Sequence, residues 1–185
     1  MPLLFAIGFL VMGSFVTIYN YIGFRLVTAP FSLSQTALGA IFTVYLFGIA
    51  ASWLAGRMGD RLGYFTVLPI GLAIQAAGCL LTLFAPLPVI IVGIILVTVG
   101  FFVSHSVASA LVGRLALHTK GHASSLYLLA YYLGSSVAGA AGGYFWVADG
   151  WSAVAEFTFC HACHCVRSGT GCSPPVKPEL RLDKR

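Results

Sequence analysis

Five long apolar runs, separated by short polar breaks, occupy most of the first 150 or so residues. A helix needs roughly 20 apolar residues to cross about 30 Å of hydrocarbon. The runs cover approximately 3–25, 36–56, 65–85, 88–111 and 123–147. This pattern predicts an all-α, polytopic membrane protein in which residues 1–155 form one bundle of about five transmembrane helices.

Composition and charge narrow the class of protein further. Of the 185 residues, 59% are hydrophobic and only 8% are charged, whereas a soluble domain carries roughly a quarter charged residues. An ordinary soluble fold is therefore excluded. The formal net charge is +5, but the cations are scattered between the apolar runs, and nucleic-acid binding would need a clustered basic face.

The loop cations predict the orientation in the membrane. Loops 56–64 and 112–122 fall on the same side of a five-span bundle and carry Arg57, Arg61, Arg114 and Lys120, whereas the opposite side carries only Arg25. Cytoplasmic loops are enriched in Lys and Arg. We therefore expect the first group of loops, and the N-terminus with it, to face the cytoplasm. The first run is too long for a cleavable signal peptide.

A charged segment, GRMGDRLG at residues 56–63, follows the second apolar run. Glycines permit a tight turn between helices, and a helix N-terminus favours a nearby carboxylate such as that of Asp60. Its two arginines could pair with Asp60 or with a neighbouring helix end, or they could serve only as topology anchors. We interpret the segment as a conformational-switch loop built from Gly56, Arg57, Gly59, Asp60, Arg61 and Gly63.

The pattern Gly-x-x-x-Asp-Arg-x-Gly in this loop resembles the signature loop of the major facilitator superfamily. The stretch 105–151 is similar to the C-terminal half of bacterial inner-membrane efflux permeases of that superfamily, and the resemblance covers about residues 1–155. It implies helices seven to eleven or twelve of a twelve-helix secondary transporter in the bacterial inner membrane. The implied activity is export of a small organic solute, driven by protons, with a separate N-terminal half as partner.

Polar groups inside the spans are candidates for the solute path, because ionisable groups at membrane depth are costly. His105 could relay protons, or it could be a neutral side chain hydrogen-bonded to a neighbouring helix. By resemblance, Asn20 on the first span and His105 on the fourth line the central cavity. Tyr131 could stack on an aromatic or cationic solute or simply pack between helices. No carboxylate lies inside a span, so a coupling carboxylate would have to come from the other half.

Small residues recur every four positions in the fifth span. Ser135, Gly139 and Gly143 form one stripe, and Gly134, Ala138 and Gly142 form a second beside it. Such spacing lets helix backbones approach closely in membranes. The stripes therefore predict helix packing.

The composition changes abruptly after about residue 155. Residues 156–185 hold four of the five cysteines and eight of the fifteen charges, and include the run CHACHC at 160–165. A zinc site would need a second, distant ligand pair, which is missing. We favour a frameshift, because G+C-rich codons for Ala and Leu read out of register yield Cys, His, Pro and Arg. Residues 156–185 are then an aberrant, disordered Cys/His/Pro tail, and the sixth span is lost.

The chain shows no nucleophile elbow, phosphate-binding loop or paired carboxylates. We therefore expect no enzyme, no cofactor and no metal site, but an incomplete transporter half that is inactive alone. The alternative is a membrane binding or assembly module that pairs with another transporter half.

Overall fold

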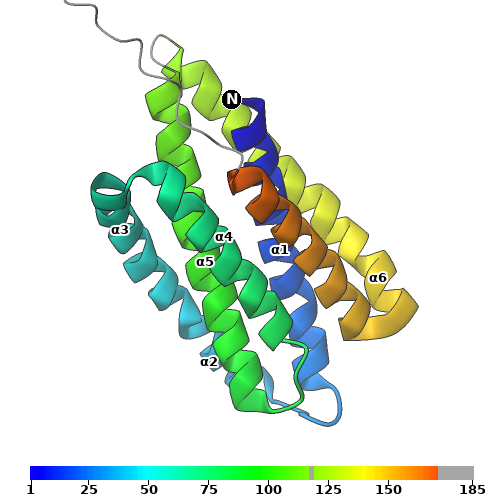
Figure 1. Ribbon diagram of the computed structural model, residues 1–185. Coiled ribbons are helices and arrows are strands. Elements are labelled where there is room, and N and C mark those ends of the chain that lie inside the picture. Colours follow the sequence, from blue (N-terminus) through cyan, green and yellow to red (C-terminus); the bar gives the residue numbers. More distant parts are fainter. Residues whose placement is uncertain (117–118, 171–185) are drawn as a thin grey trace, which may run out of the picture.

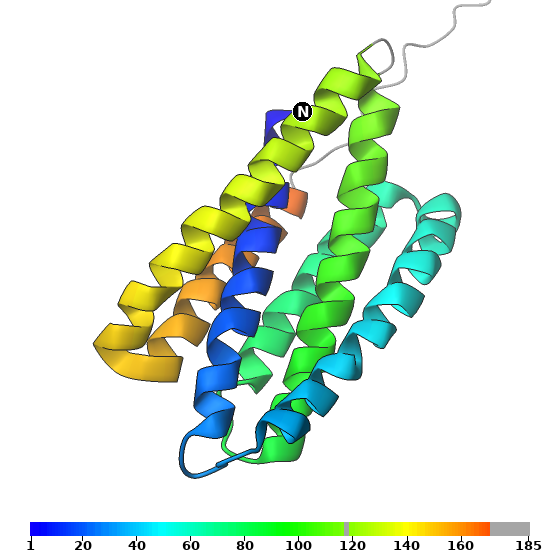
Figure 2. The ribbon, with the colours of Figure 1, turned by 180° about the vertical axis from the view of Figure 1, so that it is seen from behind.

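The computed structural model describes residues 1–116 and 119–170, which form six α-helices and one short 3₁₀ segment (Figures 1 and 2). In chain order they are α1 (Pro2–Val27), α2 (Gln35–Ile41), η1 (Phe42–Val44), α3 (Tyr45–Leu62), α4 (Tyr64–Leu81), α5 (Leu87–Leu115) and α6 (Lys120–Thr170). The helices lie side by side along a common direction, with α3 and α6 at opposite edges in Figure 1. The prediction of an all-α bundle is confirmed.

Helix α6 is a hairpin of two limbs rather than one rod. The backbone leaves the helical region at Asp149 and Gly150, and Gly150 has φ 60°. Glycine adopts this left-handed conformation at no steric cost. The two limbs therefore run antiparallel, as the yellow and orange segments of Figure 1 show.

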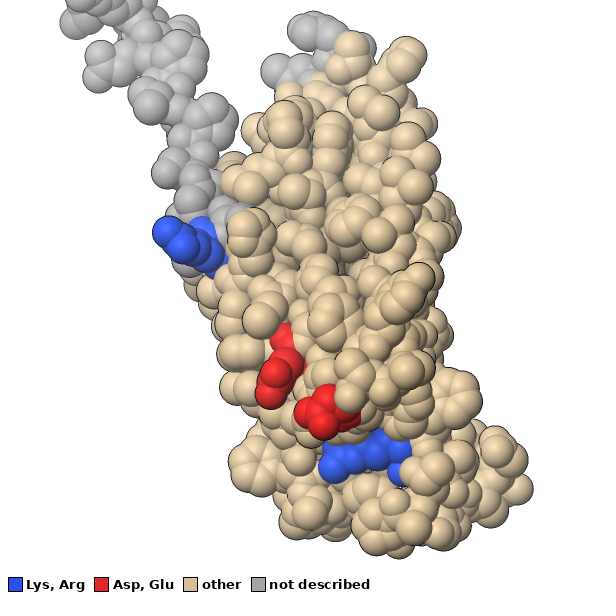
Figure 3. Space-filling view, turned by 90° about the vertical axis from the view of Figure 1, so that its right-hand side faces the viewer, with Lys and Arg blue, Asp and Glu red and all other residues tan. Residues whose placement is uncertain are grey.

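Four helical segments are long and apolar enough to cross a membrane within the described part of the chain. They are Pro2–Val27, Gln35–Leu62, Tyr64–Leu81 and Leu87–Leu115. The fifth predicted span, 123–147, is helical but falls outside these four because its many Gly, Ser and Tyr residues lower its hydropathy. Figure 3 shows a face of the molecule with very few charged side chains, as expected for a surface that contacts lipid.

The core of the bundle is built from two closely packed helix pairs, α1 with α6 and α4 with α5. Large aliphatic side chains of α1, α4 and α5 fill the space between the pairs; Ile18, Leu68 and Ile94 are fully buried. Helix α3 packs mainly on α5. In Figure 2, α1, α3, α5 and the first limb of α6 lie in front, and α4 and the second limb of α6 lie behind them.

The predicted tail, residues 156–185, begins inside the second limb of α6, and this limb is not among the described segments that are long and apolar enough to cross a membrane. Helix continues to Thr170. Its buried positions follow a helical period: Val154, Ala155, Thr158, Ala162 and Cys165. Free cysteine behaves as a small apolar residue, so this segment can still present a packing face. The rest of the predicted tail, 171–185, lies outside the described residues.

Candidate functional site

An aromatic seam runs between α1, α3, α5 and the first limb of α6. We define it as the contacting rings of the following residues: Phe15, Tyr19, Tyr45, Phe101, Phe102, His105, Tyr127 and Tyr131. Each ring contacts at least one other within the distances typical of aromatic pairs. The seam thus joins four helices through one continuous set of side chains.

Tyr19 and Tyr45 form one end of the seam. Their ring centroids lie 5.0 Å apart, and the Tyr19 hydroxyl shares a hydrogen bond of 2.6 Å with the Thr98 hydroxyl on α5. Phe15 stacks on Phe101 with centroids 3.9 Å apart and carries the contact into the middle of the bundle. The hydroxyl of Tyr19 is therefore hydrogen-bonded within the protein, and its ring packs against Phe15 and Tyr45.

His105 and Tyr131 form the other end. The His105 ring lies parallel to Phe101, with centroids 5.8 Å apart and an interplanar angle of 6°, and its centroid is 4.7 Å from that of Tyr131. His105 Nδ1 and the Tyr127 hydroxyl share a hydrogen bond of 3.1 Å. One ring nitrogen is thus anchored to α6, and the other, Nε2, forms no hydrogen bond within the described part of the chain.

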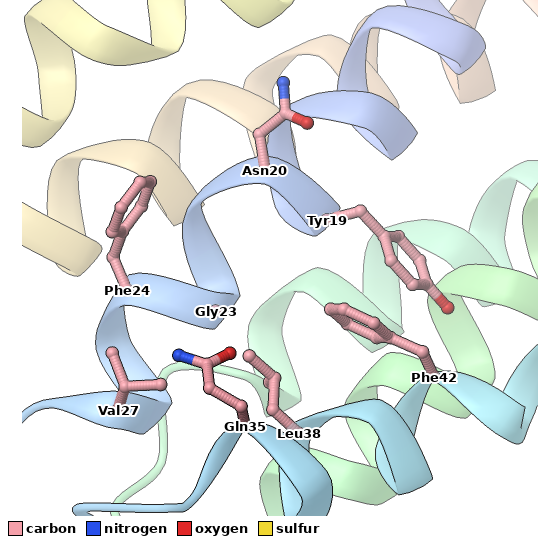
Figure 4. A pocket seen from close by; sticks show the side chains of 8 residues that line it. All are labelled: Tyr19, Asn20, Gly23, Phe24, Val27, Gln35, Leu38 and Phe42. Carbon is pink, nitrogen blue, oxygen red and sulfur yellow. The ribbon is translucent and has the colours of Figure 1, made fainter.

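Asn20 does not join this group. It lines an open hollow of about 280 Å³ between α1 and α2, which Tyr19 also lines (Figure 4). The Tyr19 ring points toward Phe42 there, with centroids 5.5 Å apart, and Asn20 points away from both. Neighbouring positions on a helix differ in direction by about 100°, so Tyr19 reaches the seam and Asn20 does not. The structure brings His105 and Tyr131 together but leaves Asn20 apart from them.

The predicted switch loop is mostly helix. Residues 56–62 form the last two turns of α3, and the turn itself is Gly63, with φ 88°, directly before α4. Only glycine takes this conformation readily. Gly59 is also required to be small, because an added Cβ would come within 2.7 Å of the Tyr64 ring. At Gly56 the same addition would meet open space.

Asp60 makes a three-way contact across the ends of α3, α4 and α5. Its Oδ1 accepts a hydrogen bond of 2.9 Å from the Tyr64 hydroxyl and forms an ion pair of 3.2 Å with Arg114 Nη2. Arg114 also donates to the Tyr64 hydroxyl at 3.0 Å, and its Cζ lies 4.2 Å from the Tyr64 ring centroid. From the sequence, Arg114 was interpreted only as a loop cation that sets the orientation. Its place at the end of an apolar run was the one feature that could have indicated a contact at the helix ends.

The two arginines of the loop do not pair with Asp60. The Arg57 guanidinium lies 4.1 Å from the centroid of the Trp53 ring, one turn earlier on α3. Arg61 is exposed and has no ion pair within the described part of the chain. The charged side chains of the predicted switch therefore fall into two groups. Asp60 is paired with Arg114, whereas the two arginines face outward.

A second polar contact, which the sequence did not indicate, lies at the opposite end of the bundle. Arg25 at the end of α1 donates to the carbonyl oxygens of Thr82 and Phe84, the latter at 3.0 Å. Trp151, the first residue after the α6 bend, donates to the same Thr82 oxygen at 2.9 Å. The contact holds α1, the α4–α5 turn and the second limb of α6 together.

The small residues of α6 face α1. An added Cβ at Gly134 would overlap the Phe9 backbone, and one at Gly142 would come within 2.6 Å of the Tyr21 ring. The other stripe is looser: added Cβ atoms would lie 3.4 Å from Asn20 at Gly139 and 3.1 Å from Tyr21 at Gly143. Ser135 is half-buried. The tightest approach therefore belongs to the 134–138–142 stripe, and Ser135, Gly139 and Gly143 lie beside it.

The described residues contain no group of three or more His, Cys, Asp or Glu side chains placed to hold a metal ion. Cys160 and Cys163 are exposed, whereas Cys165 is buried.

Comparison with known proteins places the chain in a family. The model of the Major Facilitator Superfamily matches residues 4–160. The uncharacterized MFS-type transporter YybF of Bacillus subtilis is 50% identical over 151 residues, 82% of this chain and 37% of its own length. The inner membrane transport protein YnfM of Escherichia coli is 49% identical over 157 residues, 85% of this chain and 38% of its own length.

A third relative aligns over a similar stretch. An uncharacterized transporter of Buchnera aphidicola from Schizaphis graminum is 43% identical over 155 residues, 84% of this chain and 38% of its own length. The chain therefore spans well under half the length of the curated relatives it matches. No solved structure matches it. The family match over most of the sequence and these identities show that the chain belongs to the major facilitator superfamily.

Proposed function

We propose that this chain forms one half, the C-terminal one, of a secondary transporter for a small organic solute, with the aromatic seam as its wall of the solute path. The observation that carries the proposal is the position of His105. This side chain is half-buried and has no charged residue beside it in the sequence. It lies between an aromatic ring of α5 and two aromatic rings of α6. Histidine at membrane depth is a functional candidate by default.

The seam indicates the kind of solute. Its side chains are aromatic rings with a few hydroxyl groups and one imidazole, and none carries a carboxylate or a guanidinium. Such a wall recognises a planar, largely apolar molecule by stacking, and a delocalised cation through the ring faces. His105 would add one hydrogen bond and, in proton-driven export, a side chain that can relay a proton.

The two polar contacts at the ends of the bundle suit a rocking mechanism. Family members move one half against the other around a site near the membrane midplane. The Asp60–Arg114 pair is exposed, with side chains 60–65% accessible, and such pairs are worth about 0–1 kcal/mol. A link this weak can open and close in each cycle. We assign it to the cytoplasmic end, following the loop cations.

A fusion protein tests the assignment of the seam. The N-terminal part of the E. coli relative would be joined to this chain in place of its own C-terminal half. Uptake of fluorescent dyes (ethidium, Hoechst 33342 and carboxyfluorescein) would be followed in energised inverted vesicles. Only dyes that the unmodified relative moves would be scored.

We expect the fusion protein to move at least one of these dyes, and we expect this transport to stop when an uncoupler is added. His105→Ala and Tyr131→Ala should reduce transport to background, whereas Tyr144→Ala, at a position 81% exposed on α6, should not. Full transport by both seam variants at normal membrane levels would show that the seam does not line the path.

A further inference from the structure

Helix α3 carries one face that no other part of the described chain covers. Its buried positions are Gly48, Ala51, Ala55 and Gly59. With about 100° per residue, the direction opposite to them is occupied by Leu46, Trp53, Arg57 and, slightly to one side, Arg61. Leu46 is 67% and Trp53 64% exposed. We refer to these four residues as the outer α3 stripe.

The chemistry of the stripe changes along the helix. It begins with apolar Leu46, with exposed Ile49 beside it, passes through Trp53, and ends with two guanidinium groups in the last two turns of α3. Trp is typical of the boundary between hydrocarbon and headgroups. The order matches a phospholipid lying along the helix, with its acyl chain on Leu46, its glycerol region at Trp53 and its phosphate at the arginines.

The two arginines have charge available for an anion. Asp60, the carboxylate closest in sequence, is bound to Arg114 and Tyr64 instead. Arg57 is held over the Trp53 ring at 4.1 Å, which fixes its guanidinium beside the stripe. Guanidinium groups bind phosphate oxygens through paired hydrogen bonds.

We propose that the outer α3 stripe is a binding site for an anionic phospholipid, with the phosphate held by Arg57 and Arg61 and the lipid body by Trp53 and Leu46. A zwitterionic lipid fits less well, because its ammonium group would be repelled by two arginines whose nearest carboxylate, Asp60, is paired with Arg114. The stripe is separate from the aromatic seam, so the site does not depend on the proposed solute path.

Native mass spectrometry of the full chain in a neutral detergent tests the proposal. The probes are dioleoyl phosphatidylglycerol and dioleoyl phosphatidylcholine at equal concentration, with inorganic phosphate as a third sample. We expect the chain to retain phosphatidylglycerol over phosphatidylcholine by roughly tenfold, since each arginine near the headgroups strengthens anionic-lipid binding severalfold. Excess inorganic phosphate should not displace the lipid, because it cannot occupy the apolar part of the stripe.

The double variant Arg57→Gln/Arg61→Gln should lose this preference, whereas Lys120→Gln, which removes another exposed cation at the start of α6, should keep it. Equal retention of the two lipids by the wild-type chain would overturn the proposal. So would an unchanged preference in the double variant, or displacement by phosphate alone. The two-lipid comparison in the wild type needs no variant and stands even if the double variant fails to fold.

Discussion

Asp60 forms its ion pair with a residue 54 positions away and not with the arginines beside it. At the residue scale, the reason is the direction of side chains on a helix. Asp60 reaches Tyr64 one turn later and Arg114 at the end of α5, whereas the guanidinium of Arg57 lies over the Trp53 ring. A local sequence motif therefore gave the residue types of this contact but not its partners.

Removing the Asp60–Arg114 pair should have only a small effect on stability. Both side chains are largely exposed, so we expect Asp60→Asn or Arg114→Gln to reduce the free energy of unfolding by less than about 1 kcal/mol. Most of this difference should vanish in about 1 M salt, where screening is strong. Thermal unfolding in a neutral detergent measures it, and Arg61→Gln is the matched control. A loss of several kcal/mol, independent of salt, would show that the pair is a structural element and not a switch.

Tyr127 should matter more to stability than its exposed neighbours. Its side chain is 2% exposed, and its hydroxyl shares a hydrogen bond with His105. Tyr127→Phe should therefore cost about 1 kcal/mol, the usual net value of a buried hydrogen bond. Tyr132→Phe, at a position 61% exposed on the same helix, should be neutral. Equal unfolding temperatures for the two variants would argue against the His105–Tyr127 hydrogen bond.

At the scale of elements, the contact between α1 and α6 depends on glycine. Gly134→Ala would place a Cβ against the Phe9 backbone, which cannot move aside as a flexible side chain can, so we expect a loss of about 1–3 kcal/mol. Gly113→Ala is the control, since an added Cβ meets nothing within 4 Å there and alanine favours helix. Denaturant unfolding in mixed micelles would compare them. A tolerated Gly134→Ala would mean that the helices are farther apart than described.

The second limb of α6 makes a prediction about thiol reactivity. Cys165 is buried in this limb, and Cys163 is exposed on it. We compare two variants in detergent, each of which keeps only one of these two cysteines. Cys163 should react with a maleimide at least about ten times faster than Cys165, because only Cys165 is protected by packing. The difference should disappear after denaturation. Equal rates before denaturation are the outcome expected of a disordered tail.

The sequence predicted best the helices that can be recognised by their length and hydropathy. The expected runs 36–56, 65–85 and 88–111 correspond to Gln35–Leu62, Tyr64–Leu81 and Leu87–Leu115. The structure differs from the expected boundaries at two places where polar residues are helical. The charged residues after Gly56 continue α3, and the Cys/His run continues α6, because side chains on the exposed side of a helix do not interrupt its backbone hydrogen bonds.

The candidate site was predictable only in part, because its geometry depends on how the helices pack against one another. His105 stood out as an ionisable group in an apolar run, and Tyr131 as an aromatic residue on a neighbouring span. That these two rings lie 4.7 Å apart, and that Tyr19 rather than Asn20 faces the seam, depends on how α1, α5 and α6 are rotated against one another. Nothing in one sequence fixes that rotation.

At the scale of the whole molecule, the chain corresponds to only part of the length of its relatives. The chain covers 37–38% of the length of the relatives from B. subtilis and E. coli. A secondary transporter of this family encloses its solute between two halves. We therefore propose that residues 1–185 contribute one wall and do not transport by themselves.

The most direct test compares the chain alone with the fusion protein described above, both reconstituted at equal density in proteoliposomes with an imposed proton gradient. The readout is gradient-driven movement of a dye that the E. coli relative transports. The account predicts movement by the fusion protein and none above empty liposomes by residues 1–185 alone. Robust transport by the chain alone would contradict it.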